Sequence, residues 1–317
     1  MKKLGLITMT AAMMAAVPAA CVSASDLTFT TGGDQGTYYG FGSVLAGQVS
    51  GKTDTTVTAI TSGGSQANID AIDMGDAQLG FVQSDVMAYA YEGINLFEEI
   101  GAIQNFSTVS AMYMEQVQIV TCNPDIKTVE DLKGKNVSIG APGSGVYFNA
   151  MDILGAYGLT EDDITPTYES FGDSAESLQD GKIDAAFITA GAPTTAVTSL
   201  GTSKDVYLVG LDEEHINSLI ETCPYYSQNT IAADVYGLDE DINTVAVGAV
   251  VIAGDDVAEE DVYNFVSAVF ENVDEITTAH AKGAELDLDF AASVTAVPYH
   301  AGAAKYFEEK GITVPVK

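Results

Sequence analysis

The sequence of 317 residues predicts an α/β protein made of two related lobes. Its length suits two domains, since a domain commonly holds about 100–200 residues. A unit of strand, glycine-rich turn and helix occurs twice, and strands alternate with helices along the chain, as they do in mostly parallel sheets. Because such sheets bind ligands outside the carboxyl ends of their strands, we expect both glycine turns at a ligand site.

The two units match each other closely. A strand pattern at 27–30 leads into a glycine turn at 32–36 and a helix, and a strand at 137–139 leads into a turn at 140–145 and another helix. At one constant offset, Gly36-Thr37-Tyr38-Tyr39 aligns with Gly145-Val146-Tyr147-Phe148, and Leu45 with Leu154. Residues 74–81 also resemble 180–187. This order favours two homologous halves over chance similarity between α/β segments.

Further strands are predicted at 205–209 and 244–252, the second apolar enough to be buried. Helices are predicted at 213–221 and, in two or three pieces, over 257–310. The apolar stripe of the last region is typical of packing and carries no chemistry.

The charge of the chain excludes one class of function. Forty-five acidic residues stand against twelve lysines, with no arginine, so the formal charge is −33. Such a chain repels phosphate backbones and anionic lipids, which excludes nucleic-acid binding. Because only 18% of residues are charged and 47% are hydrophobic, the acids form a solvated shell around a core.

The N-terminus predicts export. Lys2 and Lys3 precede an apolar run at 4–20, and Val22-Ser23-Ala24 follows as a small-x-small cleavage pattern, so residues 1–24 are predicted as a signal peptide. A membrane anchor competes, but the run is short of the ~20 residues that span a bilayer. A lipid anchor on Cys21 is the other alternative; Pro18 departs from that signal, and soluble export is favoured.

Two further cysteines, Cys122 and Cys223, would lie in an oxidising compartment. An even pair there commonly forms a disulfide. Two buried, reduced thiols remain the alternative, because sequence spacing does not show proximity.

Several catalytic chemistries lack their motifs. The sequence has no HExxH, no paired CxxC and three scattered histidines, so no metal site is expected. It also has no GxSxG elbow and no GxxxxGK[ST] loop, which disfavours esterase chemistry and nucleotide hydrolysis. A lone cysteine nucleophile needs a neighbouring histidine that the sequence does not indicate. No cofactor is expected.

Polar residues at strand ends indicate a binding site instead. Residues 61–68 follow a predicted strand and contain two glycines, several hydroxyls and Asn68. Residues Gln83-Ser84-Asp85 end another predicted strand and begin a helix. Ser65 and Asp85 could also serve only as N-caps. Without arginine, an anionic ligand would be met by backbone N–H groups, hydroxyls or a lysine such as Lys182. A solvated surface lysine is the alternative for Lys182.

Taken in order, these segments resemble the TAXI family of solute receptors, which serve tripartite ATP-independent periplasmic (TRAP) transporters. The resemblance covers essentially the whole mature chain. It rests on Thr31-Gly32-Gly33 with Gly36-Thr37-Tyr38-Tyr39, Thr61-Ser62-Gly63-Gly64-Ser65 with Asn68, Gln83-Ser84-Asp85, Asp131-Leu132-Lys133-Gly134-Lys135, residues 140–145, residues 180–187 with Gly191 and Pro193, and His300 with Gly302 and Ala303.

The resemblance implies a two-lobed periplasmic-binding-protein-like fold of type II topology, with a ligand cleft between lobes that the chain joins twice. Lobe I would comprise 25–113 and 228–317, and lobe II 114–227. The implied function is a monomeric receptor that hands a small organic anion or amino acid, of the glutamate or 2-oxoglutarate class, to membrane subunits. On that topology Cys122 and Cys223 fall beside the crossings, which predicts a disulfide between them.

Lobe closure would then trap the solute. Tyr38, Tyr39, Tyr147 and Phe187 are candidate aromatic walls or packing residues. Two other functions stay open: an exported enzyme of the same fold that uses Cys122 or a cleft carboxylate such as Asp85, and a surface antigen or adhesin. The predicted ligand-binding residues are Thr37, Tyr38, Tyr39, Ser62, Ser65, Asn68, Gln83, Ser84, Asp85, Gly143, Ser144, Gly145, Thr189 and Gly191.

Overall fold

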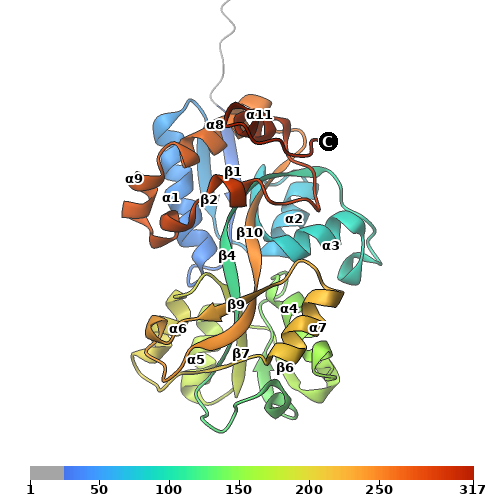
Figure 1. The fold of residues 1–317 in the computed structure, drawn as a ribbon, viewed down its shortest axis with the longest axis vertical. Helices are drawn as coiled ribbons and strands as arrows, with labels where there is room; N and C mark the ends of the chain where they lie inside the picture. The colour runs from blue at the N-terminus through green and yellow to red at the C-terminus, as the bar shows by residue number, and fades with distance from the viewer. Residues whose placement is uncertain (1–24) are drawn as a thin grey trace, which may run out of the picture.

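The computed structural model describes residues 25–317, so the predicted signal peptide and Cys21 lie outside the described residues. Two lobes are stacked along the long axis of the molecule and are joined by the long strands β4 (Phe106–Thr121) and β10 (Ile242–Gly254) (Figure 1). The strands form one sheet in the order β2-β1-β3-β10-β4-β7-β5-β6, with β8 paired to β4 and β9 to β10. The predicted α/β class is confirmed.

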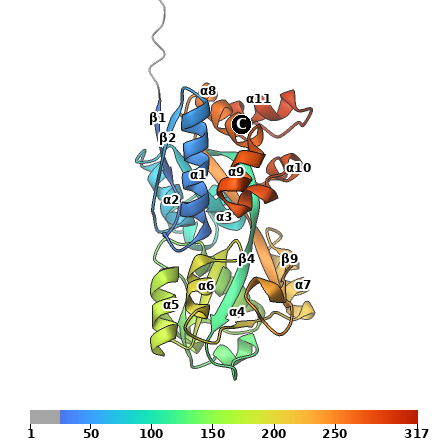
Figure 2. The same cartoon turned by 90° about the vertical axis from the view of Figure 1, so that its left-hand side faces the viewer.

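The first lobe is built on three parallel strands, and its second half comes from the C-terminal part of the chain (Figure 2). Its strands are β1 (Asp26–Thr30), β2 (Thr56–Ile60) and β3 (Leu79–Gln83). Its helices are α1 (Thr37–Lys52), α2 (Ser65–Asp73), α3 (Ser84–Glu92), α8 (Glu259–Phe270), α9 (Val273–Ala279), α10 (Leu288–Ala291) and α11 (Ala301–Glu309), with the 3-10 helices η1 (Asn95–Phe97) and η5 (Ala281–Glu285).

The second lobe repeats the plan of the first, with β5 and α4 in the places of β1 and α1. Its strands are β5 (Asn136–Ser138), β6 (Thr165–Thr167), β7 (Ala185–Ala190), β8 (Tyr207–Val209) and β9 (Ser227–Ile231). Its helices are α4 (Val146–Ala156), α5 (Phe171–Asp180), α6 (Thr195–Gly201) and α7 (Glu213–Thr222), with the 3-10 helices η2 (Val129–Leu132), η3 (Glu161–Asp163) and η4 (Ala233–Val235).

Each lobe packs helices on both faces of its part of the sheet. In the first lobe α1 and α8 cover one face around Phe29 and Phe81, whose rings lie 5.1 Å apart, and α2 and α3 cover the other. In the second lobe α4 and α7 cover one face, and α5 and α6 the other. A sheet covered on both faces needs near-continuous apolar strands, and β10 is buried from Thr244 onward.

The two crossings are continuous strands rather than loops. Strand β4 pairs with β10 in the first lobe and with β7 in the second, so one strand belongs to both cores. Ile231 and Ile242 pack in the core of the second lobe. We therefore place the return of the chain into the first lobe within β10, later than the predicted boundary at residue 228.

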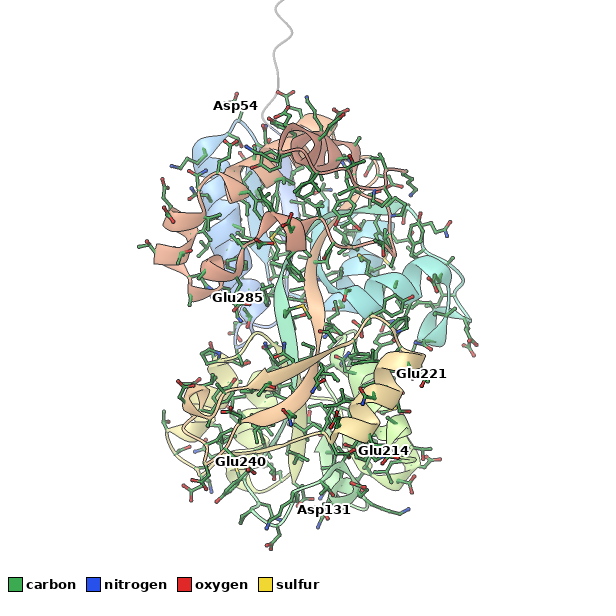
Figure 3. The ribbon with its side chains drawn as sticks, viewed as in Figure 1. Asp54, Asp131, Glu214, Glu221, Glu240 and Glu285 are labelled. Atoms are coloured by element: carbon green, nitrogen blue, oxygen red, sulfur yellow. The ribbon has the colours of Figure 1, made fainter. Side chains whose placement is uncertain are left out.

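Most acidic side chains lie outside these cores; Asp85, Glu115 and Asp261 are the buried exceptions among the described residues. Six exposed examples from both lobes are labelled in Figure 3: Asp54, Asp131, Glu214, Glu221, Glu240 and Glu285. The excess acid is thus a solvated shell, as the composition predicted. No helix in the described part of the chain is both long and apolar enough to cross a bilayer.

The predicted disulfide is wrong in this structure, because Cys122 and Cys223 are free thiols. Strand β4 continues past the crossing to Thr121 and carries Cys122 to the far end of the second lobe, beside Lys204. Cys223 ends α7 near Tyr89 of the first lobe. Because a strand advances about 3.3 Å per residue, each residue of β4 beyond the crossing carries Cys122 farther from Cys223. Bonded cysteines need their Cα atoms within about 7 Å of each other.

Candidate functional site

The turn that contains Gly63 and Gly64 meets the glycine turn at 140–145 where the lobes face each other. The backbone N–H of Ala67 donates to the carbonyl oxygen of Gly143 at 3.0 Å, which joins the start of α2 to the turn before α4. A Cβ atom placed on Gly64 would lie 3.3 Å from Cα of Ser144. Backbone can approach backbone this closely only where side chains are missing. The lobes are therefore closed on each other.

A second set of contacts joins α1 to the end of β7. The Thr37 hydroxyl donates to the carbonyl oxygen of Gly191 at 3.1 Å, and the backbone N–H of Ala196 donates to the carbonyl oxygen of Gln35 at 3.3 Å. Between these contacts and the glycine turns lies a pocket of about 90 Å³. A single water needs roughly 10–15 Å³ of such space, so the pocket has room for a small solute.

Four helices begin at this pocket. Its walls include the first residues of α1, α2, α4 and α5, namely Thr37, Ser65, Val146 and Phe171. A helix N-terminus carries free N–H groups and about half a positive charge, so it favours anions. These four N-termini come together because each helix follows the carboxyl end of a parallel strand, through a glycine-bearing turn for α1, α2 and α4 and through residues 168–170 for α5.

Two polar side chains in the pocket lack a partner. Gln83 is 3% exposed and Ser144 is 7% exposed, yet neither Gln83 Oε1 nor Ser144 Oγ makes a hydrogen bond within residues 25–317. A buried polar atom without a partner costs about 1–3 kcal/mol. Both atoms line the pocket, so a bound solute could satisfy them. Ser65 differs, because its Oγ already accepts from the backbone N–H of Gln83.

The pocket also contains one buried carboxylate, Glu115, which stands on β4 where that strand passes between the lobes. Its side chain accepts a hydrogen bond of 2.7 Å from the Tyr38 hydroxyl. Burial raises the pKa of Glu115 to about 8, although this hydrogen bond and the charge of Lys282 lower it in part. The Tyr38 ring in turn stacks on Phe81 at 4.7 Å.

Behind the pocket, a buried polar network links the lobes. Asp85 of α3 accepts from Asn149 Nδ2 of α4 at 2.8 Å, and Asn149 Oδ1 accepts from the Thr189 hydroxyl at 2.7 Å. The Tyr226 hydroxyl accepts from Asn149 and donates to Asp152. Burial and the charge of Asp152 raise the pKa of Asp85 to about 7. Asp85 thus helps to hold the lobes together and does not line the pocket.

This architecture has counterparts among known proteins. The profile of the NMT1-like family matches residues 29–311. The chain belongs to the NMT1-like family.

Solved structures share the fold of this NMT1-like chain at low identity. A protein from Bordetella bronchiseptica RB50 matches with a TM-score of 0.54 and 16% identity, over 90% of this chain and 89% of that one. A putative L-cystine ABC transporter from Listeria monocytogenes gives 0.52 and 16%, over 83% and 98%. The alkanesulfonate-binding protein SsuA from Xanthomonas axonopodis pv. citri, bound to MOPS, gives 0.50 and 15%, over 92% of each chain. The predicted fold of two-lobed periplasmic binding proteins is confirmed.

Eight of the predicted ligand residues come together in the pocket of the NMT1-like fold. They are Thr37, Tyr38, Ser62, Ser65, Gln83, Ser144, Gly145 and Thr189. Their contact with a ligand stays a prediction. Glu115 and Phe171, which also line the pocket, were missed; the available signal for Glu115 was that it is the one charged residue in strand β4.

The other predicted residues have structural contacts outside the pocket lining. Asn68 donates to the carbonyl oxygens of Thr31 and Phe81, and Ser84 accepts from the backbone N–H of Gly248. Gly143 and Gly191 form the lobe contacts described above, and Tyr39 is half-buried on α1.

The remaining candidates from the sequence also lie elsewhere. Tyr147 donates to Glu161, Phe187 packs in the second-lobe core, and Lys182 is exposed and pairs with Asp180 at 2.8 Å. Phe171 stands in the pocket wall where Tyr147 and Phe187 were candidates.

Proposed function

We propose that this chain is an extracytoplasmic receptor that captures a small solute by closing its two lobes and presents it to the membrane subunits of a TRAP-type transporter. One observation carries the proposal: a pocket between the closed lobes is lined by helix N-termini and by buried polar atoms that lack partners. A site of this kind suits a small polar ligand that supplies the missing hydrogen bonds.

The solute belongs to the glutamate or 2-oxoglutarate class, a small organic anion or amino acid. The resemblance of the glycine and polar motifs to TAXI receptors supports this class and the TRAP partner. The helix N-termini supply the donors that an anionic group needs in a chain without arginine. The modest pocket volume agrees with a solute of this size.

Closure is the signal to the membrane partner. A partner that binds the closed shape better than the open one responds to the solute, because the solute shifts the population toward closure. The receptor acts outside the cytoplasm, delivered by the signal peptide at residues 1–24, with a lipid anchor on Cys21 as the variant arrangement. It works as a monomer without cofactor or metal.

The enzyme alternative has less support. Its candidate groups were Cys122 and a cleft carboxylate such as Asp85, and neither of these two named residues lines the pocket. Cys122 lies at the far end of the second lobe, and Asp85 is held by Asn149. The residues lining the pocket include no histidine, cysteine or lysine among those the structure describes. Glu115 is the one buried carboxyl in the described lining, and the turnover control below tests whether it transfers a proton to the solute.

A thermal-shift screen tests the receptor. Amino acids, dicarboxylates and keto acids are each added at 1 mM, and a hit is expected to raise the melting temperature by several degrees, because a ligand at 100 times its Kd adds about 2.7 kcal/mol of stability. Small-angle scattering should then show a smaller radius of gyration with the hit than without it. Mass spectrometry of the hit after incubation provides the control for turnover. No shift with any probe, or chemical conversion of the hit, would overturn the proposal.

A further inference from the structure

We propose that Glu115 receives a positively charged amino group of the solute, so that the pocket takes α-amino acids and rejects keto acids and dicarboxylates of the same size that lack an amino group. This inference rests on the proposed function, because it names the solute class of the same pocket.

The charged side chains of the described pocket wall are negative. Among the residues that the structure describes, the charged side chains lining the pocket are Asp34 and Glu115, and both are acidic. Asp34 is exposed to water, whereas Glu115 is only 2% exposed. In its ionised form a buried carboxylate repels a second carboxylate and attracts an ammonium group, and water screens it little. An ammonium group is therefore the kind of group that favours ionised Glu115, whereas a second carboxylate keeps it protonated.

Glu115 forms no ion pair with a lysine among the described residues. The nearby cation is Lys282, whose Nζ pairs with Glu285 at 2.5 Å and lies 5.3 Å from the centre of the Tyr113 ring. Lys282 does not line the pocket. Within residues 25–317 Glu115 forms no ion pair, and its one side-chain hydrogen bond comes from Tyr38 to Oε2. Oε1 is therefore available to a donor on the solute.

Both hydrogen-bond acceptors and hydrogen-bond donors without partners line the pocket. Gln83 Oε1 is a second buried acceptor without a partner, which an ammonium group can satisfy together with Glu115. The Ser144 hydroxyl and the N-termini of α1, α2, α4 and α5 are donors, which a carboxylate can satisfy. An α-amino acid carries both groups, and a keto acid carries only the second. A keto acid would leave the acceptors unpaired.

The protonation state of Glu115 should change when an amino acid binds. Burial raises the pKa of Glu115 to about 8, so the empty receptor holds a proton there over much of the neutral range. The groups around it are Tyr38 on α1, Tyr113 on β4, Asp85 on α3 and Lys282 on η5. An ammonium group beside Glu115 would lower its pKa again, because an opposite charge favours the ionised form. Binding of an amino acid at pH 7 should then release up to one proton.

Titration calorimetry tests the preference for an amino group by comparing amino acids with the keto acids that match them in size. The probes are L-glutamate with 2-oxoglutarate, L-alanine with pyruvate, and L-leucine with 4-methyl-2-oxopentanoate, at pH 7. In at least one pair the amino member is expected to bind 100-fold or more tightly than the keto member, since a site built for an N–H group strongly rejects an analogue without it. Titrations in two buffers of different ionisation enthalpy should show proton release by the amino member.

Glu115→Gln keeps an acceptor for Tyr38 and removes the charge. This variant should weaken the binding of the amino acid at least 30-fold and abolish the proton release. Glu240→Gln makes the same change at an exposed site and should leave both unchanged. A keto acid or dicarboxylate that binds as tightly as its amino partner, or binding without proton release, overturns the inference and leaves the receptor standing. Failure of every probe overturns the receptor as well.

Discussion

Asn149 donates a hydrogen bond of 2.8 Å from its Nδ2 to Oδ2 of Asp85, and this bond connects the two lobes. Asp85 lies in the first turn of α3 of the first lobe and Asn149 lies within α4 of the second, and both are fully buried. Asn149 also accepts from the hydroxyl of Thr189, a residue of the pocket wall. Closure of the pocket is thus coupled to burial of a carboxylate.

This coupling predicts that stability falls as pH rises. The pKa of Asp85 is raised from 3.8 to about 7, first by burial and then by Asp152, so the folded protein binds more protons than the unfolded chain between these pH values. The free energy of unfolding from this group is therefore largest below about pH 4, declines toward pH 7 and is lost above it. Glu115, raised from 4.5 to about 8, acts in the same direction.

Urea denaturation of the solute-free protein at pH 5, 6, 7 and 8 measures this slope. Asp85→Asn keeps an acceptor for Asn149 and removes the titration, so its stability should decline less between pH 5 and 7 than that of the wild type. Glu115→Gln should flatten the range up to pH 8. An unchanged slope in Asp85→Asn would show that Asp85 is not buried as an acid.

Gly145 provides a test of closure. A Cβ atom there would clash with Gln83 and would lie 2.8 Å from Oγ of Ser65, both across the lobe interface. The backbone of Gly145 has φ −72°, which alanine adopts without strain, so the clash arises only when the lobes close. Gly145→Ala should weaken the solute at least 10-fold in calorimetry and leave the melting temperature of the solute-free protein nearly unchanged.

Gly155 offers the matched control. It lies in the same helix α4, and a Cβ atom there would have no neighbour within 4 Å. Gly155→Ala should bind the solute as the wild type does and should gain stability of about 0.5–1 kcal/mol, because alanine favours a helix over glycine. Equal affinity of the two variants would contradict closure around Gly145.

The part of the site that the sequence predicted is the part with a local signature. Glycine turns, hydroxyls near Ser65 and Ser144 and the repeat of strand, turn and helix all lie at carboxyl ends of parallel strands, and one topological rule brings such ends together. The same rule located eight of the lining residues without any knowledge of contacts.

The missed residues depend on long-range pairing. Glu115 stands in the middle of a strand, and its place in the pocket follows from where β4 crosses between the lobes. Asn149 is an ordinary position in a helix until α3 packs against α4. The length of β4 also explains the wrong disulfide, because a strand that continues past the crossing moves Cys122 away from it.

Ser144 and Ser65 should respond in opposite ways to loss of the hydroxyl. Ser144 Oγ has no partner in the empty pocket, so Ser144→Ala should leave the free energy of unfolding unchanged or slightly higher. The same variant should weaken the solute by about 5–10-fold, the effect of one hydrogen bond of roughly 1 kcal/mol.

Ser65→Ala is the contrasting variant. Ser65 Oγ accepts from the backbone N–H of Gln83 at 3.0 Å, and its removal leaves a buried donor unsatisfied. This should lower the free energy of unfolding by about 1–3 kcal/mol. Urea denaturation and calorimetry of both variants separate the two effects, and a large stability loss in Ser144→Ala would mean that its hydroxyl already has a partner.

The free thiols lead to a chemical prediction. Burial raises the pKa of both Cys122 and Cys223, and the thiolate is the reactive form, so iodoacetamide should alkylate the native protein at pH 7 more slowly than it alkylates free cysteine. In guanidinium without reductant, both residues should be fully alkylated. Peptide mass mapping assigns each site and separates them from Cys21. Recovery of one unreduced peptide pair joining Cys122 to Cys223 would restore the disulfide and contradict their separation in the fold.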